Sequence, residues 1–322
     1  MGAEAQMSAT VLLVGGFGNL GGRIAAHLHE TADINLVLSS RFHRSAPQWA
    51  ADAHVIQLDL TDPQTFSNIP RHVDSIIQLA AVNDIESLND PDLAQLVTTD
   101  GTIMLLQEAV RRNMSRFIYF STAHVYGAPL TGHLSEITPT NPAHPYATTH
   151  LGAEAAVESA HQRNELIGIR IRLSNGFGRP MDYVSGDWRT LTSDLCRQAV
   201  IDRALSMRTD GLQQRNFMTK TDISRTVSHL LSLPATDVDN GLFNVGGMQS
   251  RSLLDMAHLI QTEAQNLFGQ EISLSAPEPA ATEYPTLDFD IDKLVRSGFT
   301  PEDNAADEIQ QFLTMIAQHH SA

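Results

Sequence analysis

Two side chains that could move a proton stand four residues apart near the middle of the chain. Tyr146 and His150 lie in a predicted helix over residues 146–163, where positions i and i+4 share one face. A phenol can exchange a proton with a substrate oxygen, but its reference pKa of about 10 makes it a weak base at neutral pH. A nearby cation would lower that pKa. An unperturbed histidine is mostly uncharged at neutral pH, so His150 would lower it less than a permanent cation would.

A second chemical feature is a run of glycines directly after a short apolar segment. Residues 10–14 read as a buried parallel strand, and Gly15, Gly18 and Gly21 follow them. A helical stretch over residues 20–30 comes next. Glycine lets the backbone turn tightly and approach a pyrophosphate, and the helix start offers free N–H groups. The pattern predicts a dinucleotide-binding turn, with a plain tight turn as the alternative.

Short apolar strands alternate with helical patterns and must position these groups. The predicted strands are residues 10–14, 34–39, 54–58, 75–79, 116–121 and 167–173, and the predicted helices are residues 20–30, 91–112 and 146–163. This alternation predicts an α/β fold of the Rossmann type, a doubly wound parallel sheet with helices on both faces. Ligands of such sheets bind at the carboxyl ends of the strands. Thr122 and Asn175 closely follow two of these ends.

The regular alternation stops at about residue 176. We expect residues 10–178 plus 215–247 to form the Rossmann domain, and residues 179–214 plus 248–322 to form a smaller substrate-binding lobe. The proline-rich stretch 129–145 is a long loop ahead of a helix. It is either functional or a connector.

Composition excludes several kinds of partner. The 322 residues carry a formal net charge of −16, which argues against nucleic acid or an anionic membrane surface. No apolar run reaches the roughly 18 residues that a membrane span needs. The single cysteine, Cys196, cannot form an internal disulfide and favours a cytoplasmic location. No metal site is predicted.

Nine motifs, in the right order, give the chain a family resemblance. They are Val14–Gly21 (TGGxGxxG), Leu79–Ala81 (LAA), Asp90–Thr102 (DPxxxxxxNVxGT), Phe120–Gly127 (FSSxxVYG), Pro145–His150 (PYxxxK), Ile171–Gly178 (LRxxNVYG), Arg215–Asp222 (RDFVxVDD), Phe243–Gly247 and Asp292–Pro301. Together they resemble the extended short-chain dehydrogenase/reductases, the NAD-dependent epimerase/dehydratase family. The resemblance covers nearly all of residues 10–315.

The resemblance implies an enzyme with a Rossmann domain, a nicotinamide cofactor and a nucleotide-activated sugar as substrate. Tyr146 would be the acid or base, and Thr122 would hydrogen-bond the reacting oxygen. Asn175 would line the site near the nicotinamide, and Arg215 would contact substrate phosphates. The other implied site residues are Asn83 on the substrate side and Gly15, Gly18, Asn19, Leu20, Gly21, Asp59, Leu60, Leu79, Ala80 and Ala81 on the cofactor side. The resemblance also implies a homodimer formed by the two helices 91–112 and 146–163.

His150 stands where the family has a lysine, which lowers the pKa of the tyrosine and hydrogen-bonds the nicotinamide ribose. Three outcomes are open: weak or pH-shifted catalysis, chemistry supported by another group such as His124, or loss of redox activity. An imidazole could still contact the ribose, so His150 is both a catalytic and a cofactor-binding candidate. If protonated His150 assists Tyr146, turnover should rise as the pH falls toward about 6.

Ala123 and His124 occupy positions where 4,6-dehydratases of the family place an aspartate and a glutamate. Their absence favours a ketoreductase or an epimerase over a dehydratase. His124 itself is either a proton relay or an ordinary loop residue.

The end of the second predicted strand bears on the choice of cofactor. The sequence there is Ser39-Ser40-Arg41, without the carboxylate that would bind the free 2′-hydroxyl of NAD, whereas an arginine accommodates the 2′-phosphate of NADP. NADP(H) is therefore favoured over NAD(H), with a solvated Arg41 as the alternative. Asp59 is either an adenine contact or a cap of the following turn.

Residues 278–286 contain no arginine, although many nucleotide-sugar enzymes of this type carry a phosphate-binding arginine there. Arg179, Arg189 and Arg208 either compensate or are surface charges. Two other hypotheses therefore stay open: a reductase of a non-nucleotide small-molecule carbonyl, and a dinucleotide-binding sensor without turnover.

Overall fold

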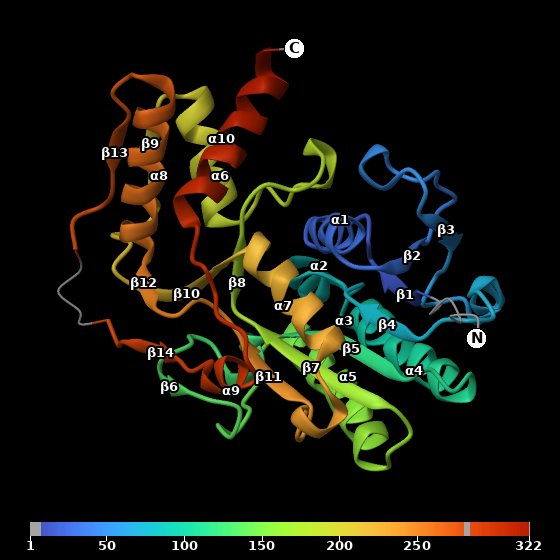
Figure 1. The fold of residues 1–322 in the computed structure, drawn as a ribbon. Helices are drawn as coiled ribbons and strands as arrows, with labels where there is room; N and C mark the ends of the chain where they lie inside the picture. Colours follow the sequence, from blue (N-terminus) through green and yellow to red (C-terminus); the bar gives the residue numbers. More distant parts are fainter. Residues whose placement is uncertain (1–7, 280–283, 322) are drawn as a thin grey trace.

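The structure, a computed structural model, describes residues 8–279 and 284–321. Its centre is a seven-stranded sheet of order β11-β7-β5-β4-β1-β2-β3, in which every neighbouring pair is parallel (Figure 1). The strands are β1 Ala9–Val14, β2 Ile34–Ser40, β3 His54–Gln57, β4 Ser75–Gln78, β5 Arg116–Thr122, β7 Ile167–Leu173 and β11 Leu242–Val245. The predicted Rossmann class is confirmed, and each of the six predicted strands ends within one residue of its observed bounds.

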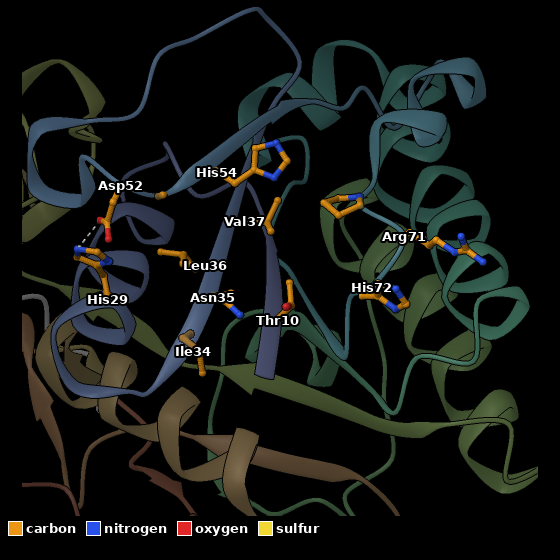
Figure 2. A pocket seen from close by; sticks show the side chains of 12 residues that line it. Thr10, His29, Ile34, Asn35, Leu36, Val37, Asp52, His54, Arg71 and His72 are labelled. Carbon is orange, nitrogen blue, oxygen red and sulfur yellow. Dashed lines mark ion pairs between the residues drawn. The ribbon is translucent and has the colours of Figure 1, made fainter. Parts of the chain in front are cut away.

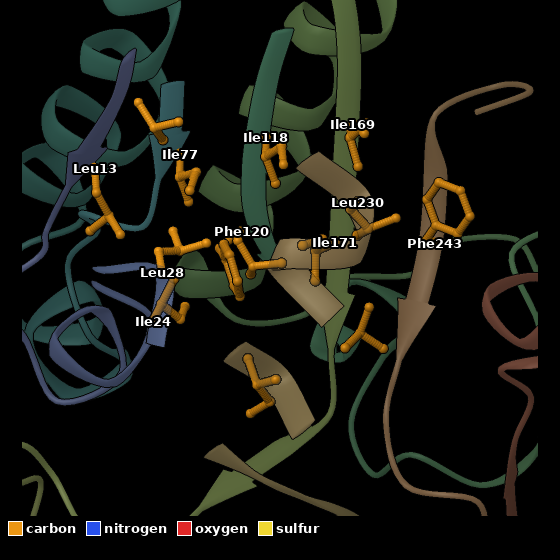
Figure 3. Close-up of a cluster of buried hydrophobic side chains, with 14 of the residues drawn as sticks. Leu13, Ile24, Leu28, Ile77, Ile118, Phe120, Ile169, Ile171, Leu230 and Phe243 are labelled. Atoms are coloured by element: carbon orange, nitrogen blue, oxygen red, sulfur yellow. The ribbon is translucent and has the colours of Figure 1, made fainter. Parts of the chain in front are cut away.

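Helices cover both faces of this sheet. The α-helices of the described residues are α1 Gly21–Thr31, α2 Asp84–Asn89, α3 Pro91–Ala94, α4 Gly101–Arg111, α5 Pro145–Gln162, α6 Leu191–Ile201, α7 Lys220–Ser232, α8 Leu253–Phe268, α9 Asp292–Arg296 and α10 Ala305–Ser321, and α1 and α7 cover one face of the sheet while α4 and α5 cover the other. Successive residues of a strand point to opposite faces of a sheet, so the side chains of β1 pack in two hydrophobic cores, one on each face. Val11 and Leu13 pack in the core of α1 and α7, whereas Leu12 and Val14 pack in that of α4 and α5. Figure 3 shows the first core, with Leu28 of α1 close to the sheet.

The predicted helix over residues 91–112 is divided by a π-helical turn, Gln95–Asp100. This wider turn buries two threonines that bond to other segments. The Thr98 hydroxyl accepts the amide of Val82 (3.1 Å), and the Thr99 hydroxyl donates to the carbonyl of Thr149 in α5 (2.7 Å). The π turn therefore ties the chain after β4 to the helix that carries Tyr146.

A separate hydrophobic cluster forms where α6, α8 and α10 pack together, at the upper left of Figure 1. Short strands join it to the central sheet. These are β8 Asn175–Phe177, β10 Gln214–Thr219 and β12 Ser250–Ser252 in one sheet, and β9 Ala204–Ser206 with β13 Ser273–Ser275 in another. Cys196 of α6 is buried in this cluster. The division of the chain into two domains at the predicted boundaries stays a prediction.

The proline-rich stretch 129–145 contains a strand that pairs with the C-terminal part of the chain. Strand β6, Gly132–Leu134, runs parallel to β14, Leu287–Phe289. Asn244 of β11 joins the same segments, because its side-chain N–H groups donate to the carbonyls of Leu134 (3.2 Å) and Asp290 (3.0 Å). Its amide oxygen accepts the Tyr126 hydroxyl (2.6 Å). The loop is thereby ordered by residues more than a hundred positions away.

Candidate active site

The carboxyl ends of β4 and β5 meet strands β8 and β10 around one cavity of about 410 Å³. The catalytic and substrate-binding candidates that line it are Asn83, Thr122, His124, Tyr146, Asn175 and Arg215. Thr122 is the last residue of β5, and Tyr146 lies in the first turn of α5. Asn83 caps α2 by accepting the amide of Glu86 (3.0 Å). The structure thus gathers these six side chains, whereas His150 is not among the residues that line the cavity.

Tyr146 and Thr122 line the same cavity, close enough for the Thr122 hydroxyl to stabilise the phenolate form of Tyr146. Burial raises the pKa of Tyr146, and the Asp84 carboxylate raises it further, while the Thr122 hydroxyl partly opposes them. No cation contributes to that pKa within the described residues. The phenol therefore carries its proton at neutral pH.

His150 is turned toward the sheet. Its Nδ1 lies 2.7 Å from the hydroxyl of Tyr119 in β5, and its Nε2 is buried without a partner in the described part of the chain. The ring still packs edge-on against Tyr146, with 4.6 Å between ring centroids. Burial lowers the pKa of His150 to about 4. This lowered pKa argues against the expected gain in turnover toward pH 6, which stays a prediction.

Glu154, one turn beyond His150, is a buried carboxylate with its own cation. Arg172 donates to it at 2.7 Å, and the Ser121 hydroxyl donates at 2.5 Å. This pairing offsets the charge of Glu154, so the carboxylate does little to hold a proton on the nearby imidazole.

His124 stands on the cavity wall beside Thr122, whose hydroxyl accepts its backbone N–H (3.2 Å). Burial lowers the pKa of His124, and the positive charge of Arg215 lowers it further, against the opposing charge of Asp84. The imidazole is therefore largely neutral at neutral pH and able to accept a proton. Its placement in the cavity agrees with the proton-relay alternative, and its role stays a prediction.

The glycine-rich turn has the shape of a phosphate cradle. Gly15 has φ +90°, a conformation that favours glycine, and a Cβ on Gly21 would lie 2.1 Å from the Gly15 carbonyl oxygen. Helix α1 starts without a side-chain cap. Within the described residues, the amides of Asn19 and Leu20 have no acceptor. Free N–H groups and the positive end of the α1 dipole therefore coincide.

Two exposed arginines follow β2. Arg44 lies over the ring of Phe17 in the glycine-rich turn, 5.3 Å from its centroid, and Arg41 lies over Phe42 at 4.9 Å. The sequence alone suggested Arg41 but not Arg44. Arg44 lies only four residues after the end of β2, and this short spacing could have suggested it as well. Asp59 accepts both the amide (2.9 Å) and the hydroxyl (2.8 Å) of Thr61. These bonds fit the capping alternative.

The remaining cofactor-side candidates surround the cradle. Ala80 follows β4 and lies against the glycine-rich turn, because a Cβ on Gly15 would meet its amide nitrogen at 3.1 Å. Leu79 is half-buried beside it, and Ala81 is exposed. Leu60 is buried after β3.

The three arginines that were expected either to compensate for the arginine-free segment or to be surface charges are scattered. Arg189 bonds to Asp187 (3.0 Å) near the cavity edge, Arg179 bonds to Gln311 (3.3 Å) and Arg208 is exposed. Residues 280–283 of the segment 278–286 lie outside the described residues.

Comparison with known proteins decides the family. A model of the NAD dependent epimerase/dehydratase family matches residues 11–246. The chain belongs to this family of enzymes. A UDP-glucose 4-epimerase of Lacticaseibacillus casei is 25% identical over 297 residues, covering 86% of this chain and 87% of that protein.

Two solved structures share the fold. One is the UDP-N-acetylglucosamine 4-epimerase of Methanobrevibacter ruminantium, with a TM-score of 0.80 and 19% identity over 98% of this chain and all of that one. The other is RMD of Pseudomonas aeruginosa complexed with NADPH, with a TM-score of 0.77 and 22% identity over 97% of this chain and 99% of that one.

The chain's own residues fit the dinucleotide of this epimerase/dehydratase family. A side chain on Gly21 would clash with Gly15, so the turn can close only as glycine. The unpaired amides of Asn19 and Leu20 are donors for an anion. These residues would hold the diphosphate of a nicotinamide dinucleotide.

Another hollow, of about 430 Å³, lies at the amino ends of β1, β2 and β3 (Figure 2). Thr10, Ile34 and His54 line it, and His29 pairs with Asp52 at its edge (3.2 Å). Ligands of doubly wound sheets bind at the opposite end, so this hollow is not the candidate site.

Two kinds of feature are absent from the described residues, a membrane-spanning helix and a metal-binding cluster. Across residues 8–279 and 284–321, no helix has the length and apolar character of a membrane span. In the same part of the chain, no cluster of three or more His, Cys, Asp or Glu side chains is arranged to hold a metal ion.

Proposed function

We propose that this enzyme is an NAD(P)-dependent oxidoreductase or epimerase that transfers a hydride at a carbinol or ketone carbon of a nucleotide-activated sugar. One observation carries the proposal. Tyr146 and Thr122 meet Asn175 and Arg215 in one cavity, at the same edge of the sheet as the glycine-rich cradle. A proton donor, a hydrogen-bonding partner for the reacting oxygen and a cation for phosphate then face the same space.

Among the reactions of this class, reduction of a ketone is favoured over epimerisation. An epimerase first oxidises its substrate, so its tyrosine must act as a base. Here the pKa of Tyr146 is raised by burial and no adjoining cation lowers it, which suits an acid instead. Ketone reduction uses that acid, because the new alkoxide needs a proton.

The mechanism assigns one task to each side chain. When bound, the nicotinamide ring supplies or accepts the hydride. Tyr146 gives its proton to the substrate oxygen, and Thr122 holds that oxygen and the phenol together. His150 keeps the phenol in place through ring packing (4.6 Å) and remains neutral. His124, on the same wall, would take a proton from solvent and pass one to the Tyr146 phenolate after turnover.

The substrate class rests on Arg215 and on the relatives. Burial lowers the pKa of the Arg215 guanidinium, yet it stays charged in the cavity, where it would bind a phosphate. The L. casei relative is named for a UDP-sugar. Asp84 and Asp187 also line the cavity and repel anions, which supports the second candidate, a reductase of a non-nucleotide carbonyl.

Calorimetric titration with UDP, GDP and dTDP separates these two candidates. Binding of one nucleotide that Arg215→Ala weakens about tenfold or more supports the nucleotide-sugar substrate. The matched control is Arg208→Ala, an exposed arginine seven positions earlier in the chain that does not line the cavity. If no nucleotide binds at millimolar concentration while a nicotinamide dinucleotide does, the non-nucleotide candidate replaces the first.

The cofactor choice and the homodimer are further parts of the proposal. Arg41 and Arg44 support NADP(H) because both stand after β2, and Arg44 lies against Phe17 of the glycine-rich turn. In the two helices of the proposed dimer, Leu105, Leu106 and Val157 are buried against the sheet. The proposed dimer must therefore use other faces of these helices.

A further inference from the structure

Lys220, the first residue of α7, is a buried cation with neutral partners. It is 3% exposed, and its Nζ donates to the Asn19 side-chain oxygen and to the Gly178 carbonyl, both at 2.7 Å. An ammonium group has three N–H donors, so these two bonds leave one unused. Within residues 8–279 and 284–321 no carboxylate forms an ion pair with Lys220. The nearest candidate, Glu308, is bound instead by Arg23 (3.2 Å) and Thr221 (2.6 Å).

This unpaired charge stands beside the phosphate cradle. Asn19 belongs to the glycine-rich turn, and its amide is one of the unpaired donors at the positive end of α1. A buried cation near that end is unfavourable alone, because no ion pair within the described residues offsets its charge and the helix end is itself positive. An anion bound at the same place would compensate both. The charge distribution therefore favours a ligand that carries at least one full negative charge.

The charged groups around Lys220 come from four segments. Glu308 of α10 and Asp187 raise its pKa, and Arg23 of α1 and Arg179 lower it. Burial is the largest influence, and the pKa of Lys220 falls to about 7. Lys220 is thus half-protonated near neutral pH when the cradle holds no anion.

We propose that Lys220 is a second anchor for the diphosphate of the bound dinucleotide, acting with the α1 amides through its unused N–H donor and its charge. This inference rests on the proposed function, since it needs a dinucleotide in the cradle. Neither the family motifs nor the sequence spacing assigned this residue to the site. Lys220 is a binding residue and takes no part in proton transfer to the substrate.

The proposal fixes how affinity depends on pH. A diphosphate favours protonated Lys220 and raises its pKa in the complex. Below about pH 7 the lysine is already charged, so affinity is constant. Above that pH, each binding event must take up a proton, and affinity falls by up to about tenfold per pH unit until the pKa of the complex is reached.

The experiment is calorimetric titration of the full chain with NADPH between pH 6 and 9, in buffers of different ionisation heat. Three proteins are compared: the wild type, Lys220→Met and the matched control Lys293→Met. Lys293 is the only other lysine of the sequence and pairs with Asp239 (3.0 Å), away from the cradle. At pH 6.5 we expect Lys220→Met to bind about ten- to hundredfold more weakly than the wild type, with no proton uptake. The control should stay within about twofold.

A second measurement uses the wild-type protein, so it tests the inference even if Lys220→Met does not fold. Protein labelled with 13C at the lysine ε-carbon gives two lysine signals, because the chain has two lysines. We expect one to titrate at about pH 7 and to shift to a higher pH when NADPH is added. Equal affinity of the wild type and a folded Lys220→Met, or a lysine signal that NADPH leaves unchanged, overturns the inference alone. A wild type that binds no nicotinamide dinucleotide overturns the proposed function as well.

Discussion

His150 and Lys220 are both buried bases with lowered pKa values, yet they stand in opposite situations. His150 lies against neutral partners, with Nδ1 held by Tyr119 and Nε2 enclosed, and no anionic group of the described residues raises its pKa. Lys220 is bonded to Asn19 in the glycine-rich turn, at the edge of the anion site that we propose. Burial lowers the pKa in both cases, but only a bound ligand can reverse the effect, and only at Lys220.

This comparison indicates that pH affects cofactor binding and the proton-transfer step differently. Position 150, beside the proposed acid Tyr146, holds a neutral histidine where the family has a lysine, and a buried cation lies instead beside the glycine-rich turn. We therefore expect cofactor affinity to vary with pH around neutrality, while the proton-transfer step does not. Each prediction below changes one side of this contrast.

The largest effect should come from Tyr146→Phe, which removes the proposed acid. We expect kcat for ketone reduction to fall about 10²- to 10⁴-fold, with the Kd for NADPH unchanged. Steady-state kinetics and titration calorimetry measure the two quantities. The control Tyr183→Phe, outside the cavity, should keep its kcat. Equal activity of the two variants would remove Tyr146 from the mechanism.

His150→Lys restores the family's cation beside Tyr146. A charge there would lower the pKa of the phenol and make it a better base, so alcohol oxidation at neutral pH should accelerate about tenfold. His150→Gln, which is neutral, is the matched control and should give no acceleration. The idea that the missing charge sets the preferred direction fails if both variants oxidise alcohol at the same rate.

Arg41→Ala and Arg44→Ala test the adenosine end of the cofactor. We expect each to weaken NADPH binding by about tenfold and to leave NADH binding nearly unchanged, because only NADPH carries the 2′-phosphate. Arg71→Ala changes an exposed arginine at the opposite end of the sheet and serves as control. Equal losses for both dinucleotides would contradict the proposed NADP preference.

The smallest expected effect is that of pH on kcat, which we expect to be nearly constant. At saturating NADPH, kcat for ketone reduction should vary by less than about twofold between pH 6 and 9. His150 changes charge only near pH 4, and the raised pKa keeps Tyr146 protonated throughout this range. A kcat that rises tenfold toward pH 6 would instead restore a cationic histidine to the mechanism.

Local patterns predicted the sheet well. Strands β1 to β5 are short apolar runs followed by turns, and their bounds depend mainly on neighbouring residues. The pairing of β6 with β14 was not predicted, because it joins residues about 150 positions apart. The π turn that buries Thr98 and Thr99 was not predicted either, because no local sequence signal indicates it.

Some features of the candidate site were likewise predicted from local sequence, and others were not. Motif spacing predicted residues of one cavity: Thr122 ends β5 and Tyr146 starts α5, and Asn175 and Arg215 lie at the beginnings of β8 and β10. It did not predict the state of His150, because the decisive partner, Tyr119, lies on a neighbouring strand. Lys220 was missed for the same reason: its partners Asn19 and Gly178 come from distant segments.

Asn244 has a consequence for how the protein is made. Its amide joins Tyr126, in the turn after the strand that carries Thr122, to the carbonyls of Leu134 and Asp290. During synthesis, the strand that carries Thr122 is made long before residue 290. The hydrogen bonds through Asn244 can all form only after residue 290 has been added, so this side of the cavity gains its last long-range contacts late in chain growth.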